Sequence, residues 1–226
     1  MKQGRVVLYL LFASGCVDIT VNGASGTGGS SAVCSLGGTA GGGAGPGGAV
    51  SKPAKATDNI TLRGNLDQTA WVLTWDPVSP KTTSNFTTSL TVYDSLGKAI
   101  QLDLYFSKDD ASHLEPGDSG DWTYHAMTDG ANLAFQVDGT TPTVYGTPTP
   151  IAGGRLRFDT AGRLVSNTTT SQGFYPRNAA SPQVLTFNFG TGTEIGGNGL
   201  DGLVQYAATS AISFVDQSGS AAIIAP

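Results

Sequence analysis

The feature that most constrains this sequence is a turn motif that occurs twice, each time between runs of alternating apolar and polar residues. The motif reads aromatic residue, Asp, Ser or Thr, any residue, Gly, then Lys or Arg, and it occupies residues 93–98 and 158–163. Asp suits the first position of a type I turn because its carboxylate caps a nearby backbone N–H, and Gly accepts the positive φ that closes the hairpin with a bulge. Each motif therefore predicts a β-hairpin.

The residues on both sides of the first turn alternate with a period of two. The apolar face is formed by Leu90, Val92, Ile100, Leu102, Leu104 and Phe106. The opposite face carries Thr91, Tyr93, Gln101, Asp103 and Tyr105. This alternation predicts a hairpin with one face buried and the other face exposed.

Other short runs have the composition of strands. We expect these strands at residues 60–63, 71–75, 122–127, 133–137 and 184–189. Residues 76–80 should interrupt the chain, because proline cannot donate to a sheet ladder. Residues 210–226 lose the alternating pattern, and no stretch of ten or more residues has a convincing helical period.

The composition agrees with an all-β body. Glycine accounts for 32 of the 226 residues, and Glu115 and Glu194 are the only glutamates. Glu and Lys favour helix surfaces, whereas Thr, Asn, Asp and Gly favour strands, turns and loops. The predicted fold class is therefore all-β, with antiparallel sheets in a barrel-like or sandwich-like domain, hairpins, little helix and a disordered Gly-rich N-terminus.

The first fifty residues differ from the rest of the chain. Residues 1–21 contain two early cations and an apolar run that is too short to span a bilayer but suits a signal-like segment. Cys16 follows Ala13-Ser14-Gly15 and resembles a lipoprotein cleavage site; the other reading is a non-native start. Residues 22–51 are Gly-rich, and we expect a flexible linker there.

Charge and cysteine content exclude several classes of function. The net charge of −5 and the pI of about 4.8 argue against nucleic acid as a partner, because phosphate binding requires clustered Lys and Arg. Both cysteines, Cys16 and Cys34, precede the predicted β body. The fold should therefore depend on neither a disulfide nor a zinc ion.

The sequence offers few candidates for catalysis or metal binding. His113 lies in an acidic stretch, residues 109–118, whose spacing matches no cation-binding loop, so we expect a solvated loop. His125 is expected on a strand surface, and turn chemistry explains the repeated Asp94 and Asp159. The aromatic residues could form either a sugar platform or sheet core: Trp71, Trp75, Trp122, Tyr93 and Tyr105. We expect no catalytic, cofactor-binding or metal-binding residues, and no cofactor.

Four segments of the chain resemble bacterial flagellar hook proteins, and they occur in that family's order. They are residues 53–67, 89–98 followed by 102–106, 154–164, and 184–189 followed by 202–207, within a resemblance that runs from about residue 52 to residue 222. The resemblance assigns residues 81–202 to the outer β domain of a hook protein. It assigns residues 52–80 and 203–226 to part of the inner domain.

This resemblance implies a non-catalytic structural subunit of the hook, the flexible joint between basal body and filament. It implies export without a cleaved signal and an extracellular location in the hook and basal body. The implied partners are other copies of the chain in a helical array and other flagellar rod, hook and cap proteins. No nucleic acid or small-molecule substrate is expected.

The sequence also departs from the family's pattern. Hook proteins have helical segments before and after these regions, and this sequence shows neither, so we expect a fragment or diverged relative that folds without polymerising. One alternative is a surface lipoprotein or binding module, lipid-anchored through Cys16, with its β domain on the Gly-rich tether. Another is a carbohydrate-active enzyme on a β scaffold.

Overall fold

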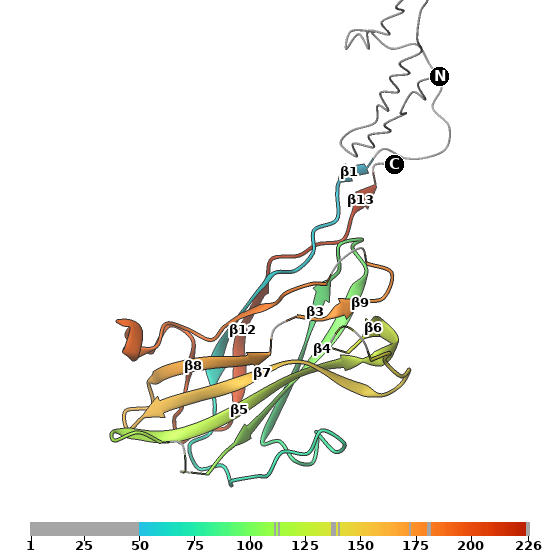
Figure 1. Cartoon of the computed structure of the whole chain (residues 1–226). Coiled ribbons are helices and arrows are strands. Elements are labelled where there is room, and N and C mark those ends of the chain that lie inside the picture. The colour runs from blue at the N-terminus through green and yellow to red at the C-terminus, as the bar shows by residue number, and fades with distance from the viewer. Residues whose placement is uncertain are drawn as a thin grey trace, which may run out of the picture. The chain divides into compact units, whose positions relative to one another are not determined.

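The largest sheet contains both predicted hairpins and is antiparallel throughout. The computed structural model describes residues 50–224 except 111, 113, 137, 138, 140, 172, 180 and 181. In strand order, the large sheet consists of β3 (Phe86–Tyr93), β4 (Ala99–Lys108), β5 (Asp118–Asp129), β7 (Pro148–Asp159) and β8 (Leu164–Ser171). Its strands follow the chain in order, as the colours of Figure 1 show.

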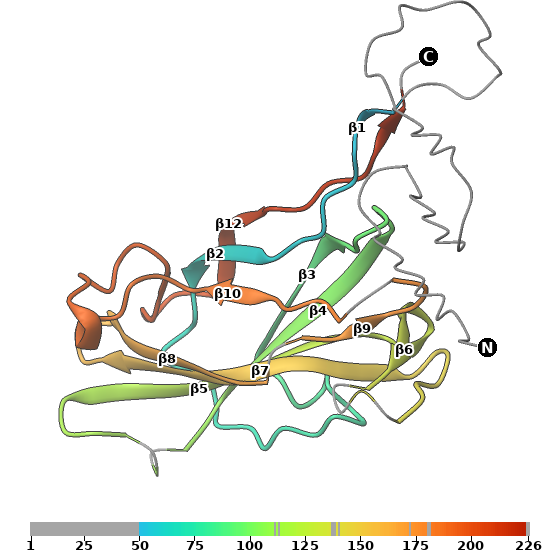
Figure 2. The ribbon, with the colours of Figure 1, turned by 45° about the horizontal axis from the view of Figure 1, so that its top comes forward.

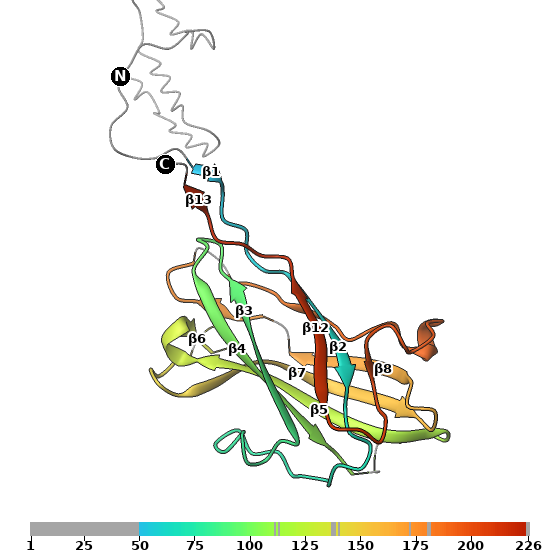
Figure 3. The ribbon, with the colours of Figure 1, turned by 180° about the vertical axis from the view of Figure 1, so that it is seen from behind.

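A smaller sheet is centred on β2 (Asn59–Asn65). β12 (Ala211–Gln217) pairs with one edge of β2 in the antiparallel direction. β10 (Thr186–Asn188) and β11 (Leu203–Val204) pair with its other edge in the parallel direction. Figure 3 shows β2 and β12 side by side. The small sheet therefore joins β2, near the start of the described chain, to three strands that lie within residues 186–217.

The remaining elements are short. β1 (Val50–Lys52) pairs with β13 (Ile223–Ile224), and β6 (Leu133–Phe135) pairs with β9 (Tyr175–Pro176). Two 3-10 turns follow β5 and β10, namely η2 (Gly130–Asn132) and η3 (Thr193–Ile195). Across the part of the chain that is described, no helix has the length and apolar character needed to cross a membrane.

An aromatic layer fills the space between the two sheets, which lie one over the other in Figure 2. The Phe187 and Phe189 rings stack at 5.9 Å between centroids, and both are almost completely buried. Phe189 meets Tyr124 of the large sheet edge-on at 4.7 Å and Phe106 at 6.3 Å. Edge-to-face geometry of this kind adds to the free energy gained by burying the rings. The architecture is a β-sandwich, and the predicted all-β fold class is confirmed.

The predicted strand at residues 71–75 is wrong. These residues belong to the outer loop, which we define as residues 66–85 and which is the teal segment at the bottom of Figure 1. Trp71 is 85% exposed and Val72 is 54% exposed, so the segment has no buried face. It is held by isolated hydrogen bonds, such as that from the Leu73 N–H to the Lys108 carbonyl, rather than by a ladder.

Residues 210–226 lack alternation, as the sequence indicated, and yet they contain β12, a seven-residue strand. Alternation is missing because most of β12 is solvent-exposed on both faces; Phe214 and Val215 on successive positions are 46% and 40% exposed. An edge strand of this kind buries too little on either face to impose a period of two. At residues 133–137 the strand ends at Phe135, and Val137 lies outside the described residues.

The remaining strand predictions are confirmed at β2, β5 and β10. The structure does not describe residues 1–49. The interpretations of residues 1–21, of Cys16 and Cys34, and of all but the last two residues of 22–51 therefore lie outside the described residues.

Truncation of Phe189 should test the packing between the sheets. Because the ring contacts both Phe187 and the large sheet, Phe189→Ala should lower the free energy of unfolding by about 3–5 kcal/mol. Denaturant titration measures this change. Val184→Ala is the control, since Val184 is 54% exposed and its loss should change the free energy by less than about 0.5 kcal/mol. Equal effects of the two substitutions would contradict this account of the core.

Candidate functional site at the neck

The chain enters and leaves the sandwich through two adjacent segments, residues 53–58 and 218–222, which we call the neck. The Lys55 N–H donates to the Ser220 carbonyl at 2.9 Å, and the Ser220 N–H donates back to the Lys55 carbonyl at 2.8 Å. The Ser218 hydroxyl accepts from the Asp58 and Asn59 N–H groups. Beyond the neck, β1 and β13 continue the pairing away from the sandwich (Figure 1).

Thr57 ties the neck to both sheets. Its hydroxyl accepts from the Tyr93 N–H at 3.0 Å and donates to Gln217 Oε1 at 2.7 Å. The Thr57 N–H donates to the Tyr93 carbonyl at 2.8 Å. Gln183 Nε2 donates to the carbonyls of both Thr57 and Tyr93. Thr57 is fully buried, so breaking any of these bonds would leave a polar group without a partner in the interior.

Sequence reasoning did not identify this cluster. Thr57 and Gln217 are 160 positions apart, and each stands in a stretch with no motif of its own. A polar residue in a predicted loop gives no local signal that it will be buried. The only indication in the sequence was the hook-protein resemblance, which includes residues 53–67.

The first predicted turn packs directly on the neck. Asp94 Oδ1 accepts from the Leu96 and Lys98 N–H groups, both at 2.9 Å, and Gly97 has a φ of +80°. This confirms the role predicted for Asp94. A Cβ atom at Gly97 would lie 2.8 Å from Ala54 Cβ and 3.1 Å from the Ala222 nitrogen. Gly97 therefore serves both the turn and the contact with the neck.

The second turn uses the same chemistry at a different place. Asp159 Oδ1 accepts from the Ala161 and Arg163 N–H groups, both at 2.9 Å, and Gly162 has a φ of +76°. Hydrogen bonding within the turn accounts for Asp159, as predicted. The structure separates the two repeated aspartates, because each closes its own hairpin.

His125 is half-buried beneath the outer loop rather than on an open strand surface. The Trp75 ring stacks on its imidazole at 4.0 Å with an interplanar angle of 4°, and Trp75 also lies 5.5 Å from Tyr105. Burial lowers the pKa of His125 to about 4, and its buried Nε2 has no hydrogen-bond partner. The imidazole is therefore neutral at pH 7 and serves as a packing surface. His113 lies outside the described residues.

The aromatic residues proposed for a sugar platform do not share a face. Trp122 is fully buried between the sheets, whereas Trp71 is 85% exposed on the outer loop. Trp75 covers His125, and Tyr93 is half-buried beside the neck. A stacking platform requires coplanar exposed rings on one surface, and these residues do not form one.

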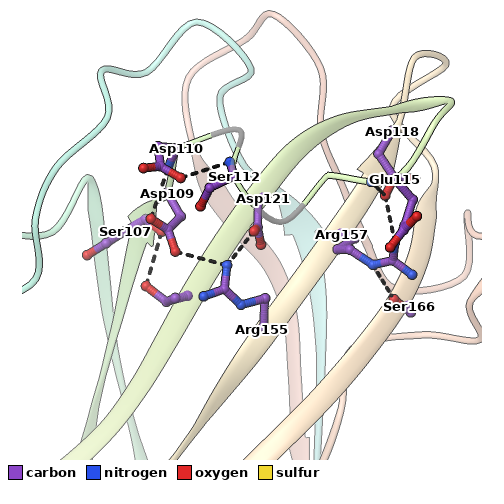
Figure 4. A network of polar contacts seen from close by, with 11 residues as sticks. Ser107, Asp109, Asp110, Ser112, Glu115, Asp118, Asp121, Arg155, Arg157 and Ser166 are labelled. Carbon is purple, nitrogen blue, oxygen red and sulfur yellow. Dashed lines mark hydrogen bonds and ion pairs between the residues drawn. The ribbon is translucent and has the colours of Figure 1, made fainter.

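The acidic stretch at residues 109–118 is held by two arginines of β7, as Figure 4 shows. Arg155 pairs with Asp109 at 2.9 Å and also with Asp121. Arg157 pairs with Asp118 at 2.8 Å and also with Glu194. Asp109 and Asp118 therefore take part in ion pairs with β7 instead of being simply solvated. Within the described residues, no group of three or more His, Cys, Asp or Glu side chains is placed to hold a metal ion.

The fold and the neck define a class of protein: a β-sandwich module joined to its flanking chain by two paired segments. Residues 62–220 match the family model of the flagellar basal body protein FlaE D2 domain, known as FlgE D2. The match covers most of the sequence, and the chain belongs to this family. The resemblance to flagellar hook proteins is confirmed, and that family is structural rather than enzymatic.

The solved structures that are similar to this chain include two from flagellar hook proteins. A 32 kDa fragment of the flagellar hook protein FlgE from Caulobacter crescentus is 15% identical with a TM-score of 0.43, over 64% of this chain and 52% of that chain. The Helicobacter pylori flagellar hook protein FlgE2 is 14% identical with a TM-score of 0.34, over 62% of this chain and 26% of that chain. This chain thus spans about half of the first and a quarter of the second. A search of curated proteins finds no match.

The contact between Gly97 and the neck can be tested with a matched glycine. Gly97→Ala should destabilise the domain more than Gly196→Ala, because both glycines have φ near +80° but only Gly97 has neighbours that a Cβ would strike. Positive φ alone should cost about 1 kcal/mol at each position. Thermal unfolding of the two variants measures the difference. Equal melting temperatures would show that the turn does not press on the neck.

His125 should make the stability of the domain depend on pH. Its pKa in the folded state is about 4, below the usual 6.5, so the unfolded chain binds the proton more tightly and stability falls as pH drops from 6.5 toward 4. Partial solvation reduces the effect to about 1–2 kcal/mol between pH 7 and pH 4.5. His125→Phe keeps the ring and removes the proton site, so this part of the pH dependence should disappear in denaturant titrations. An unchanged pH profile would refute this assignment.

Proposed function

We propose that this chain is a structural subunit of the bacterial flagellar hook, the flexible joint between basal body and filament. The observation that carries the proposal is the family match over residues 62–220. The hydrogen-bonded neck supports it, because the sandwich is attached at one place and leaves its remaining surface available for neighbours.

The proposed role is mechanical. Where two adjacent antiparallel segments connect a module to its flanking chain, tension along that chain acts on the neck first and does not pass through the sandwich. Each neck hydrogen bond contributes only about 1 kcal/mol net, so the module depends on the buried Thr57 cluster to hold its attachment. We infer that the sandwich acts as a rigid body, and that adjustment takes place at its contacts with neighbours.

The exposed surface suits adjustable contacts. The exposed residues of β3 and β12 include the polar Thr87, Ser89, Thr91, Ser213 and Asp216, beside Phe214 and Val215. Contacts through hydroxyl groups and bridging water can be exchanged at small cost, because water replaces a lost partner. A surface of this kind permits neighbouring subunits to slide, which bending of a tube requires.

We propose as partners other copies of the chain in a helical array, with other flagellar rod, hook and cap proteins. We propose an extracellular location in the hook and basal body. We propose residues 81–202 as the outer domain, and residues 52–80 with 203–226 as part of the inner domain. The ladder around β2 joins both parts in the same sandwich.

Fractionation of the bacterium that makes the protein tests this function. Purified hooks and basal bodies should contain peptides from residues 81–202, and a strain blocked in flagellar assembly should lack this material. Cys16→Ser should leave the location unchanged, because the hook requires no acylated cysteine. Recovery of the chain in membranes with a lipid on Cys16, and its absence from hooks, would contradict the proposal and favour a lipoprotein.

A further inference from the structure

We propose that the exposed Trp71–Val72 pair of one copy inserts into a hollow on the outer face of the small sheet of the next copy. This inference rests on the proposed function, since it names the surface through which copies of the chain meet. We call Trp71 and Val72 the knob. The hollow is lined by Arg63–Asn65, Leu200–Gly202, Val204, Ala211 and Ser213.

The knob is exposed although the backbone around it is held. Trp71 and Val72 are 85% and 54% exposed. The Trp71 carbonyl accepts from Asn85 Nδ2 at 2.7 Å. Two residues further along, the Leu73 N–H donates to the Lys108 carbonyl at 3.1 Å. An exposed indole on a fixed backbone loses little conformational entropy on binding, and tryptophan is enriched among the residues that dominate interfaces.

The hollow has the size and chemistry to accept an indole ring. Its volume is about 420 Å³, and glycine, alanine, leucine and valine form most of its lining. The Arg63 guanidinium stands at the rim, 5.3 Å from the Phe214 ring, and Arg63 is exposed. A guanidinium between two aromatic rings gains cation–π attraction from both. The Asp201 carboxylate, which accepts from Thr191, retains lone pairs for an indole N–H.

The two surfaces belong to different elements of the same chain. The knob stands on the outer loop, and the hollow is bounded by β2, β11 and β12 together with the loop before β11. Because Trp71 is 85% exposed, it does not fill the hollow of its own molecule. A contact between two different patches is heterologous, and when its rotation does not close it generates an open chain of subunits. We take the partner to be a second copy of this chain, because the proposed array places identical copies side by side.

The contact area indicates how strong one such contact can be. A tryptophan buries about 150–250 Å². Stable interfaces bury about 1,200–2,000 Å² in total, so the knob and hollow alone cannot hold a dimer at low concentration. In an array each copy is kept beside its neighbour, and a weak contact is then populated through high effective concentration. The expected behaviour is a monomer in dilute solution and a specific contact under crowded conditions.

Cysteine cross-linking of the full chain tests the contact. In a background with Cys16→Ser and Cys34→Ser, Val72→Cys protein mixed with Ala211→Cys protein at high concentration should form disulfide dimers under mild oxidation. Both positions are exposed, and Trp71 remains in place. Val144→Cys replaces Ala211→Cys in the control, since Val144 is 65% exposed and lies in the loop between β6 and β7, outside the hollow. The test pair should give several times more dimer than the control pair.

Two further variants complete the test. Adding Trp71→Ser to the Val72→Cys chain should reduce cross-linking to the control level, and a chain carrying both Val72→Cys and Ala211→Cys should form a ladder of multimers. Any one of three results would overturn the inference: equal cross-linking of the test and control pairs, no effect of Trp71→Ser, or a double-cysteine chain that forms dimers without larger products. Cross-linking tests the contact in purified protein, whereas fractionation tests whether the chain is part of the hook. The two experiments therefore have independent outcomes, and failure of one can be told apart from failure of the other.

Discussion

The structure depends on β2 being paired along both of its edges. β12 occupies one edge, and β10 and β11 occupy the other, so this single strand gathers the first and last parts of the described chain into one sheet. Ile60 and Leu62 point from β2 into the core and are completely buried. Without this pairing the large sheet would expose its aromatic inner face to water, at a cost of about 25 cal/mol for each Å². Closure of the sandwich therefore brings the two segments of the neck side by side.

That constraint links the fold to the proposed mechanical role. The segments that leave β2 and β12 are necessarily adjacent, because the two strands are antiparallel neighbours, and they form the neck. Thr57 and the turn at Gly97 then press the neck against the large sheet. The outer loop covers the opposite face of the large sheet through Trp75 and presents Trp71 to solvent. The attachment and the candidate contact surface thus lie on different parts of the module.

Sequence reasoning succeeded where the determinants are local. The hairpin turns at Asp94 and Asp159 follow from short-range hydrogen bonds and a glycine at positive φ, which the residue types alone specify. It failed at residues 71–75, where strand-forming residues lie in an exposed loop, and it gave no alternation from which to place β12, because pairing occurs there without burial. The neck was not predictable residue by residue, since Thr57 finds its partners at Tyr93, Gln183 and Gln217 only after long-range closure.

The most direct test of the central claim is a single-molecule pulling experiment with handles at residues 50 and 224. Force on these positions peels the paired neck one hydrogen-bonded pair at a time, instead of shearing all pairs together. The account predicts a first opening at low force that releases only the neck, followed by a separate event at higher force in which the sandwich unfolds. A single event that releases the whole domain at once would show that the neck and the sandwich are not mechanically distinct, and would contradict the account.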